Sequence, residues 1–356
     1  MLSHTKNQHL LGKLENSFVY ICRNNQSYSF MKHFVLILAL LGVCSFASAQ
    51  VPGPKVYPHE LTVAADGSGD YTTFFDAFEA CRAFMDYTVT IHVKPGTYKE
   101  KVVIPSWFEN LEIVGEDAET TIITWADHAN MPIPNTEYPK MGTFRTYTLK
   151  IEGSNITLRN LTIENNAPKL GQAVALHTEG DRLRFIGCRF LGNQDTVYTG
   201  AAWTRLYFQD CYIEGTVDFI FGPSTAWFEG CHIHSKADSY VTAASTPPEV
   251  QFGYVFCNCR LTADEGISKV CLGRPWRPYS SVIFMNCEMG SHIEARGWDN
   301  WRNPDNESTA RYAEYNNTIN GEPFTSTADW ATKLTAGSAQ GISIQRVFDF
   351  GTVWVP

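Results

Sequence analysis

Two aspartates, Asp195 and Asp218, each stand seven residues after a cysteine of a repeated phrase. The phrase reads Phe-x-x-Cys-x-apolar and occurs five times, at 185–190, 208–213, 228–233, 256–261 and 284–289. If each phrase forms one coil of a solenoid, equal offsets should place the two carboxylates side by side. Two neighbouring carboxylates cannot both ionise at low cost, so one should hold a proton while the other is charged. That division suits a general acid/base paired with a carboxylate nucleophile.

The same offset also selects Asp238, which lies seven residues after Cys231. Spacing therefore nominates three aspartates and does not choose two, and turn aspartates are the ordinary alternative. Asp218 is followed by the apolar run Phe219-Ile-Phe221, which is unusual for an exposed turn.

The repeat predicts an all-β fold, a right-handed parallel β-helix. The phrase Leu158–Ile163 extends the pattern upstream, and the spacing of 20 to 28 residues leaves room for protruding loops at some coil corners. We expect upstream strands at 61–65, 89–93, 111–114, 120–124 and 147–151. Apolar residues at helical spacing predict a helix over 73–85 that caps the open end of the solenoid. A second helix is expected near 328–334, in a C-terminal tail packed on the outside.

The first 49 of the 356 residues form a predicted signal region. A charged start at Met31, an apolar core and Ala47-Ser-Ala49 are typical of a signal peptide over 31–49, cleaved near Ala49. Met1 and Met31 remain alternative starts. We therefore expect export to the periplasm or the medium, with residues 50–356 as a single domain.

The exported chain would be acidic. Removing residues 1–49 takes four Lys/Arg and one Glu from 28 basic and 37 acidic residues, which leaves 24 and 36, a net charge of −12. This balance argues against nucleic-acid partners and against attraction to anionic membranes. We expect a monomer.

Eight cysteines remain after cleavage, and five of them occupy one repeat position each. We favour a ladder of buried thiols that pack as small apolar side chains. Disulfides joining Cys211 to Cys231 or Cys257 to Cys271 are the alternatives. No cysteine or histidine grouping has zinc-ligand spacing, so we expect no metal and no cofactor.

Beyond the repeat, the sequence resembles the pectin methylesterases (pectinesterases), carbohydrate esterases that demethylate methyl-esterified polygalacturonate. The similarity spans nearly the whole mature chain and rests on five segments in the family's order: Gly96–Glu100, Gly171–Leu176, Gln194–Tyr198, Gly215–Gly222 and Leu272–Trp276. Val197 departs from a common Leu, and the segment after Thr318 matches weakly. The family's fold is also a right-handed parallel β-helix.

The resemblance assigns roles to five polar residues. Asp218 would be the nucleophile on the C6 ester carbonyl, and Asp195 the acid that protonates departing methanol and then the base that activates water. Gln172 and Gln194 would donate hydrogen bonds to the oxyanion, and Arg274 would pair with Asp218.

The resemblance also implies that Tyr198, Phe221 and Trp276 line a sugar-binding groove. Trp298 and Trp301 could extend this groove or pack the tail. We interpret the histidines His177, His232 and His234 as structural. A polysaccharide lyase and a catalytically idle carbohydrate-binding β-helix remain alternatives. A lyase would need a calcium site, for which no cluster of acidic ligands is evident.

Overall fold

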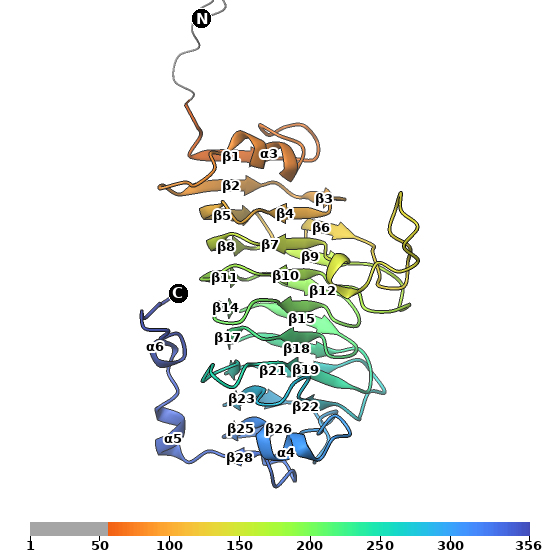
Figure 1. Ribbon diagram of the computed structural model, residues 1–356, viewed down its shortest axis with the longest axis vertical. Coiled ribbons are helices and arrows are strands. Elements are labelled where there is room, and N and C mark those ends of the chain that lie inside the picture. The colour runs from red at the N-terminus through yellow and green to blue at the C-terminus, as the bar shows by residue number, and fades with distance from the viewer. Residues whose placement is uncertain (1–55) are drawn as a thin grey trace, which may run out of the picture. The chain divides into compact units, whose positions relative to one another are not determined.

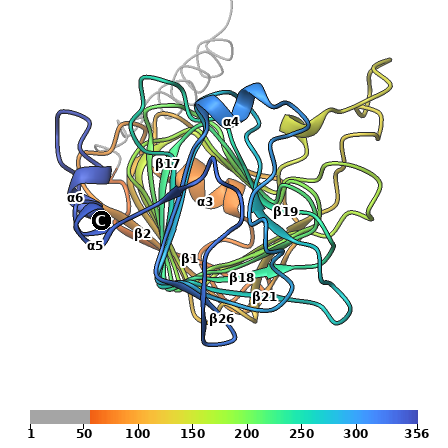
Figure 2. The same cartoon turned by 90° about the horizontal axis from the view of Figure 1, so that it is seen from below.

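The computed structural model describes residues 56–356, of which 57–356 form one compact unit. The predicted signal peptide and its cleavage site lie outside the described residues, as does the predicted domain start at residue 50. Three parallel sheets wind into a right-handed β-helix, which confirms the predicted fold (Figure 1). Seen end on, the three sheets enclose the core (Figure 2).

The largest sheet has eleven strands. They are, in spatial order, β1 (Glu60–Val63), β2 (Val89–Val93), β5 (Glu109–Gly115), β8 (Ser154–Arg159), β11 (Leu183–Ile186), β14 (Arg205–Gln209), β17 (Thr225–Glu229), β20 (Tyr254–Cys257), β23 (Ser281–Met285), β25 (Arg311–Tyr315) and β28 (Thr332–Lys333).

A ten-stranded sheet forms the second wall. It comprises β3 (Gly96–Tyr98), β6 (Thr121–Trp125), β9 (Thr162–Asn165), β12 (Arg189–Leu191), β15 (Tyr212–Gly215), β18 (His232–Ser235), β21 (Arg260–Ala263), β24 (Glu288–Met289), β26 (Asn317–Ile319) and β27 (Glu322–Phe324). Only the last pair, β26 with β27, is antiparallel among the described strands.

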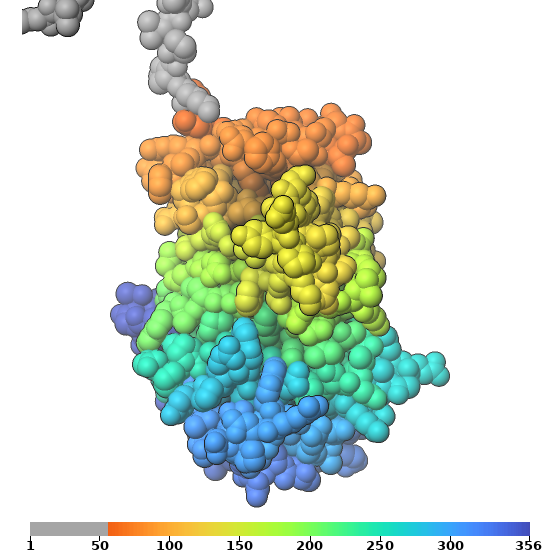
Figure 3. Space-filling view, turned by 45° about the vertical axis from the view of Figure 1, so that its right-hand side comes forward, coloured from red at the N-terminus to blue at the C-terminus, as the bar shows by residue number. Residues whose placement is uncertain are grey.

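A seven-stranded sheet forms the third wall and carries the candidate site. It comprises β4 (Val102–Ile104), β7 (Leu149–Ile151), β10 (Leu176–Thr178), β13 (Val197–Thr199), β16 (Ile220–Gly222), β19 (Tyr240–Ala244) and β22 (Cys271–Gly273). The loop between β6 and the short 3-10 helix at Thr143–Arg145 projects beside this wall (Figure 3, yellow).

The repeated phrase fills the core with a stack of phenylalanine rings. The five rings are fully buried, and successive centroids are 4.6, 4.6, 4.3 and 4.3 Å apart. Burial of each such ring contributes roughly 1.5–3 kcal/mol of transfer free energy. The stacked rings are Phe185, Phe208, Phe228, Phe256 and Phe284.

A left-handed turn residue precedes the cysteine position in successive coils. Its φ lies between 50° and 62°, a conformation that Asn, Asp and Gly tolerate best. The backbone thus turns from the eleven-stranded to the ten-stranded wall at the same point of each coil. These residues are Asn160, Gly187, Asp210, Gly230, Asn258, Asn286 and Asn316.

The cysteines of residues 56–356 are all free and buried, as the thiol ladder requires. The thiol of Cys211 donates to the carbonyl of Phe185 one coil earlier, at 3.3 Å, and the later cysteines repeat this contact. Burial raises the pKa of Cys257 and of Cys271 to about 12, so both thiols stay protonated at neutral pH.

The capping helix α3 is shorter than predicted and covers Phe74–Ala80. Thr73 caps its first turn, and Phe74 and Phe78 pack over Tyr98 and Phe108 at the open end of the core. The prediction over 81–85 was wrong. Phe84 instead has φ of 55°, is 74% exposed, and its amide donates to the carbonyl of Trp107.

The C-terminal tail packs on the outside of the eleven-stranded wall, as predicted (Figure 2). A short helix, α4 (Asp305–Thr309), precedes the last coil, and the tail contains α5 (Ala336–Gln340) and α6 (Ile344–Val347). Buried Arg205 ties the tail down by donating to the carbonyls of Phe348 and Thr352.

The helix predicted near 328–334 was wrong. Strand β28 occupies 332–333, because the open edge of β25 offers backbone hydrogen-bonding groups that a strand satisfies.

Candidate active site

Asp195 and Asp218 occupy equivalent positions in adjacent coils. Each precedes its strand by two residues, and β13 and β16 pair Val197 with Ile220. Both aspartates adopt left-handed backbone conformations, with φ of 67° and 50°. The seven-residue offset therefore places two buried carboxylates next to each other, as predicted.

Asp238 has the same offset from its cysteine but is not in register with Asp195 and Asp218. The pairing of Ile220 with Thr242 puts Tyr240, two residues later, in register with Asp218. Asp238 is exposed, and one of its carboxylate oxygens accepts hydrogen bonds from the amides of Ser268 and Lys269, both at 2.8 Å. These bonds lower its pKa, as expected for a turn aspartate.

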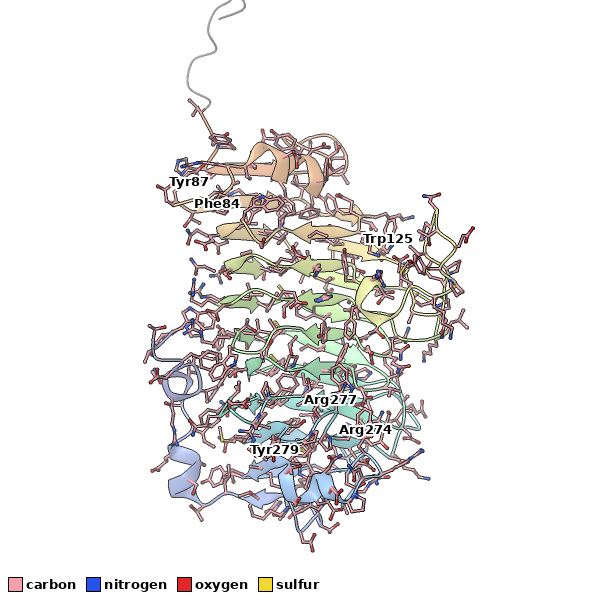
Figure 4. The ribbon with its side chains drawn as sticks, in the orientation of Figure 1. Phe84, Tyr87, Trp125, Arg274, Arg277 and Tyr279 are labelled. Atoms are coloured by element: carbon pink, nitrogen blue, oxygen red, sulfur yellow. The ribbon has the colours of Figure 1, made fainter. Side chains whose placement is uncertain are left out.

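Arg274 forms a two-pronged ion pair with Asp218. Its Nε donates to Oδ1 at 2.9 Å and its Nη2 to Oδ2 at 2.6 Å. Arg274 directly follows β22, and its amide donates to the carbonyl of Thr242 on β19. Figure 4 shows Arg274 close to the strands of this wall. This geometry fixes the direction of the carboxylate as well as its charge.

The electrostatics of the two aspartates differ. Burial, and then the charge of Asp218, raise the pKa of Asp195 well above its usual range. Burial also raises the pKa of Asp218, but the paired guanidinium of Arg274 opposes that rise. The shared proton therefore belongs on Asp195, and Asp218 is the carboxylate that stays charged.

Gln172 and Gln194 lie on neighbouring coils beside the aspartates. The amide of Ala173 donates to the carbonyl of Gln194 at 3.0 Å, and Gln194 directly precedes Asp195. Both glutamines are half-buried. Within residues 56–356 neither side-chain amide has a hydrogen-bond partner, so both are free to donate to a bound molecule.

The three predicted aromatic residues come together on the outer face of the seven-stranded wall. Tyr198 and Phe221 are register partners with ring centroids 4.8 Å apart, and Trp276 lies 5.9 Å from Phe221. Tyr198 and Trp276 are half-buried, whereas Phe221 is only 4% exposed and mainly supports them. Such rings can stack on the apolar face of a sugar.

Sequence reasoning missed two aromatic residues of this cluster. Phe144 is 47% exposed and lies 4.8 Å from Tyr198, and Tyr147 packs against the same group. Phe144 lies in the 3-10 helix at Thr143–Arg145 and Tyr147 follows it, both in the connection before β7, which has no repeat spacing. The two tryptophans whose role the sequence left open lie in different places. Trp298 is buried in the core against Phe284, whereas Trp301 joins the aromatic cluster.

The histidines interact with neighbouring side chains. His177 is buried, and its Nε2 lies 2.7 Å from Glu179 Oε1. His232 and His234 both contact the hydroxyl of Thr262, at 2.6 and 2.7 Å. In the part of the chain that is described, no group of three or more His, Cys, Asp or Glu could hold a metal. Over the same range no helix is long and apolar enough to span a bilayer.

Comparison with known proteins points in the same direction as the geometry. The profile of the family described as Pectinesterase matches residues 60–348. Pectinesterase 31 of Arabidopsis thaliana is 38% identical over 260 residues, covering 72% of this chain and 81% of the relative. Among solved structures, a pectin methylesterase from carrot has a TM-score of 0.72 and 30% identity, covering 81% and 92% of the two chains. Pectin methylesterase PemA from Erwinia chrysanthemi has a TM-score of 0.73 and 27% identity, covering 85% and 100%.

Proposed function

Because this chain belongs to the pectinesterase family of esterases, we propose that it hydrolyses the C6 methyl esters of methylated homogalacturonan to galacturonate and methanol. The observation that carries the proposal is the two-pronged pairing of Arg274 with Asp218, beside a second buried aspartate whose pKa is raised by burial and by the charge of Asp218. A solved pectin methylesterase with a TM-score of 0.71 and 27% identity to this chain is in complex with a hexasaccharide.

In the first half of the reaction, a charged Asp218 oxygen attacks the ester carbonyl carbon. The C–O bond to the methoxy group breaks as Asp195 gives that oxygen its proton, and methanol leaves. The acyl group remains on Asp218 as an anhydride. Negative charge develops on the carbonyl oxygen, where the free amides of Gln172 and Gln194 can donate.

In the second half, Asp195 is a carboxylate and removes a proton from water. The resulting hydroxide oxygen attacks the acyl carbon, and the bond to Asp218 breaks. Galacturonic acid leaves, Asp218 is again a carboxylate, and Asp195 is again protonated. The raised pKa of Asp195 suits both roles, because this group must hold a proton at the start and accept one later.

We also propose that the enzyme acts outside the cytoplasm, on the basis of the signal peptide predicted over 31–49. The acidic net charge gives no long-range attraction to polygalacturonate, so methylated and therefore neutral stretches should be approached more readily.

The test is methanol release from highly methylated pectin by the purified chain, with chelator present. We expect stoichiometric methanol and free carboxylate without shortening of the polymer. Unsaturated products that disappear with chelator would identify a lyase instead, and binding without any product would identify a carbohydrate-binding protein.

A further inference from the structure

Two aromatic rings enclose the guanidinium of Arg274. Its Cζ lies 3.9 Å from the ring centroid of Tyr240 and 3.8 Å from that of Trp301. At such distances a planar cation is attracted to the face of a ring. The rings cover two sides of the guanidinium while its Nε and Nη2 donate to Asp218, and the arginine side chain is only 20% exposed.

Tyr240 reaches this place through strand register. Ile220 and Thr242 are register partners on β16 and β19. Asp218 precedes Ile220 by two residues, and Tyr240 precedes Thr242 by two residues, so Asp218 and Tyr240 occupy equivalent positions. The amide of Asp218 donates to the carbonyl of Tyr240 at 2.9 Å, so the backbones of the two residues are directly joined. One column of equivalent positions on the wall therefore reads Asp195, Asp218, Tyr240.

Trp301 is held in place by a constrained loop. Its φ of 61° is rare for a bulky side chain, and such strain persists only where the surroundings enforce it. The carboxylate of Asp299 accepts from the amide of Trp301 at 2.8 Å and from Arg296 at 2.9 Å. The amide of Asp299 in turn donates to the carbonyl of Gly273, which joins the loop to β22.

We propose that Tyr240 is a positioning residue of the esterase site, which together with Trp301 clamps Arg274 and thereby keeps Asp218 aimed at the ester carbon. This inference rests on the function proposed above. The rings exclude water from the Arg274–Asp218 pair, which strengthens the pairing and leaves the guanidinium little freedom to swing away. Tyr240 acts through Arg274 and does not contact the reacting atoms. Because Trp301 also belongs to the aromatic cluster, Tyr240 is the better residue to test.

The first experiment compares Tyr240→Leu with Tyr240→Phe in methanol release. Loss of the ring should lower kcat about tenfold or more, with KM changed less than about twofold. Tyr240→Phe keeps the ring and should recover most of that loss. A rise in KM at constant kcat would overturn the proposal, because it would place Tyr240 against the sugar. Equal loss in both variants would also overturn it, because the hydroxyl would then be responsible.

The second experiment does not depend on activity. Hydrogen exchange of the Arg274 Nε proton is followed by NMR, with its signal identified by disappearance in Arg274→Lys. We expect exchange to be at least about tenfold faster in Tyr240→Leu than in the parent chain, because the guanidinium becomes more accessible. Tyr212→Leu, on the ten-stranded wall, is the matched control and should leave the rate unchanged. An unchanged rate in Tyr240→Leu would overturn the clamp.

The two experiments separate the clamp from the proposed function. If the parent chain releases no methanol, the function fails while the exchange rates still decide whether Tyr240 holds Arg274. If Tyr240→Leu does not fold by circular dichroism, Tyr240→Met replaces it with the same expected results, since methionine fills space without a ring.

Discussion

Asp195 and Asp218 are equivalent in the solenoid, yet only Asp218 is paired with a guanidinium. Both residues have a left-handed backbone conformation and lie at neighbouring positions of the wall. The difference in their electrostatic surroundings therefore comes from Arg274, in the chain segment after β22. In the proposed mechanism, one arginine thereby makes one of two like carboxylates the charged nucleophile and leaves the other as the protonated acid.

The nucleophile assignment predicts that Asp218→Asn lowers methanol release by at least about a thousandfold while pectin binding is retained. The amide keeps the shape of the carboxylate but is a poor nucleophile. The measurement is methanol release alongside retardation in pectin-containing gels. Asp238→Asn, at the same offset from its cysteine but out of register, is the control and should keep normal turnover. Near-normal activity in Asp218→Asn would contradict the assignment.

The ion pair predicts a pH effect. Arg274 lowers the pKa of Asp218 against the effect of burial, so its removal in Arg274→Gln should raise that pKa. In the proposed mechanism activity requires a charged Asp218, so it should be lost as pH falls through the pKa of this group. The acidic limb of the kcat/KM profile should therefore move to higher pH. Arg274→Lys keeps the charge and should move it less. An unmoved limb in Arg274→Gln would show that the pair does not set the ionisation of Asp218.

Asp195 should reduce stability while supporting activity. Its folded pKa is raised, so the folded state binds more protons than the unfolded chain, and stability decreases as pH rises from about 4 through the folded pKa. Asp195→Asn removes that penalty and should raise Tm at pH 7 by at least about 2 °C. Turnover should fall by about 10²–10⁴. The Tm difference should vanish near pH 3, and a variant less stable than its parent at pH 7 would refute this reading.

The free amide of Gln172 predicts a defect confined to the chemical step. In Gln172→Ala, kcat should fall by about 10²–10³ with KM nearly constant, as is typical when an oxyanion donor is removed. Steady-state kinetics on methylated oligogalacturonides measures both constants. If KM alone rises, Gln172 binds the sugar and does not stabilise the transition state.

The buried thiol ladder predicts insensitivity to reductant. The thermal unfolding midpoint should be the same with and without dithiothreitol, because none of the described cysteines is paired. Thiol reagents should reach these residues only after denaturation. A fall in Tm with reductant would reveal a disulfide and contradict the thiol ladder.

The repeated phrase was enough to predict the β-helix, because Phe, the left-handed turn residue and Cys recur at fixed places in successive coils. It also placed Asp195 and Asp218 correctly. It could not reject Asp238, since the length of the turn before β19 decides the register and nothing in the phrase encodes that length. Phe144 and Tyr240 were missed for a related reason. Their positions follow from loops and strand pairing, which local sequence does not reveal. Likewise, residues 332–333 form a strand where a helix was expected, because the edge of β25 offers backbone hydrogen-bonding groups. That edge exists only in the folded protein.

The two additional residues in the turn before β19 have a consequence beyond this site. They move Asp238 to the surface and place Tyr240 against Arg274, while the strands on either side keep their pairing. In such a fold, a small insertion can exchange the chemical group shown to a ligand without altering the scaffold. Turn length is therefore a source of functional variation that is independent of point substitution, and each coil can vary by this route separately from its neighbours.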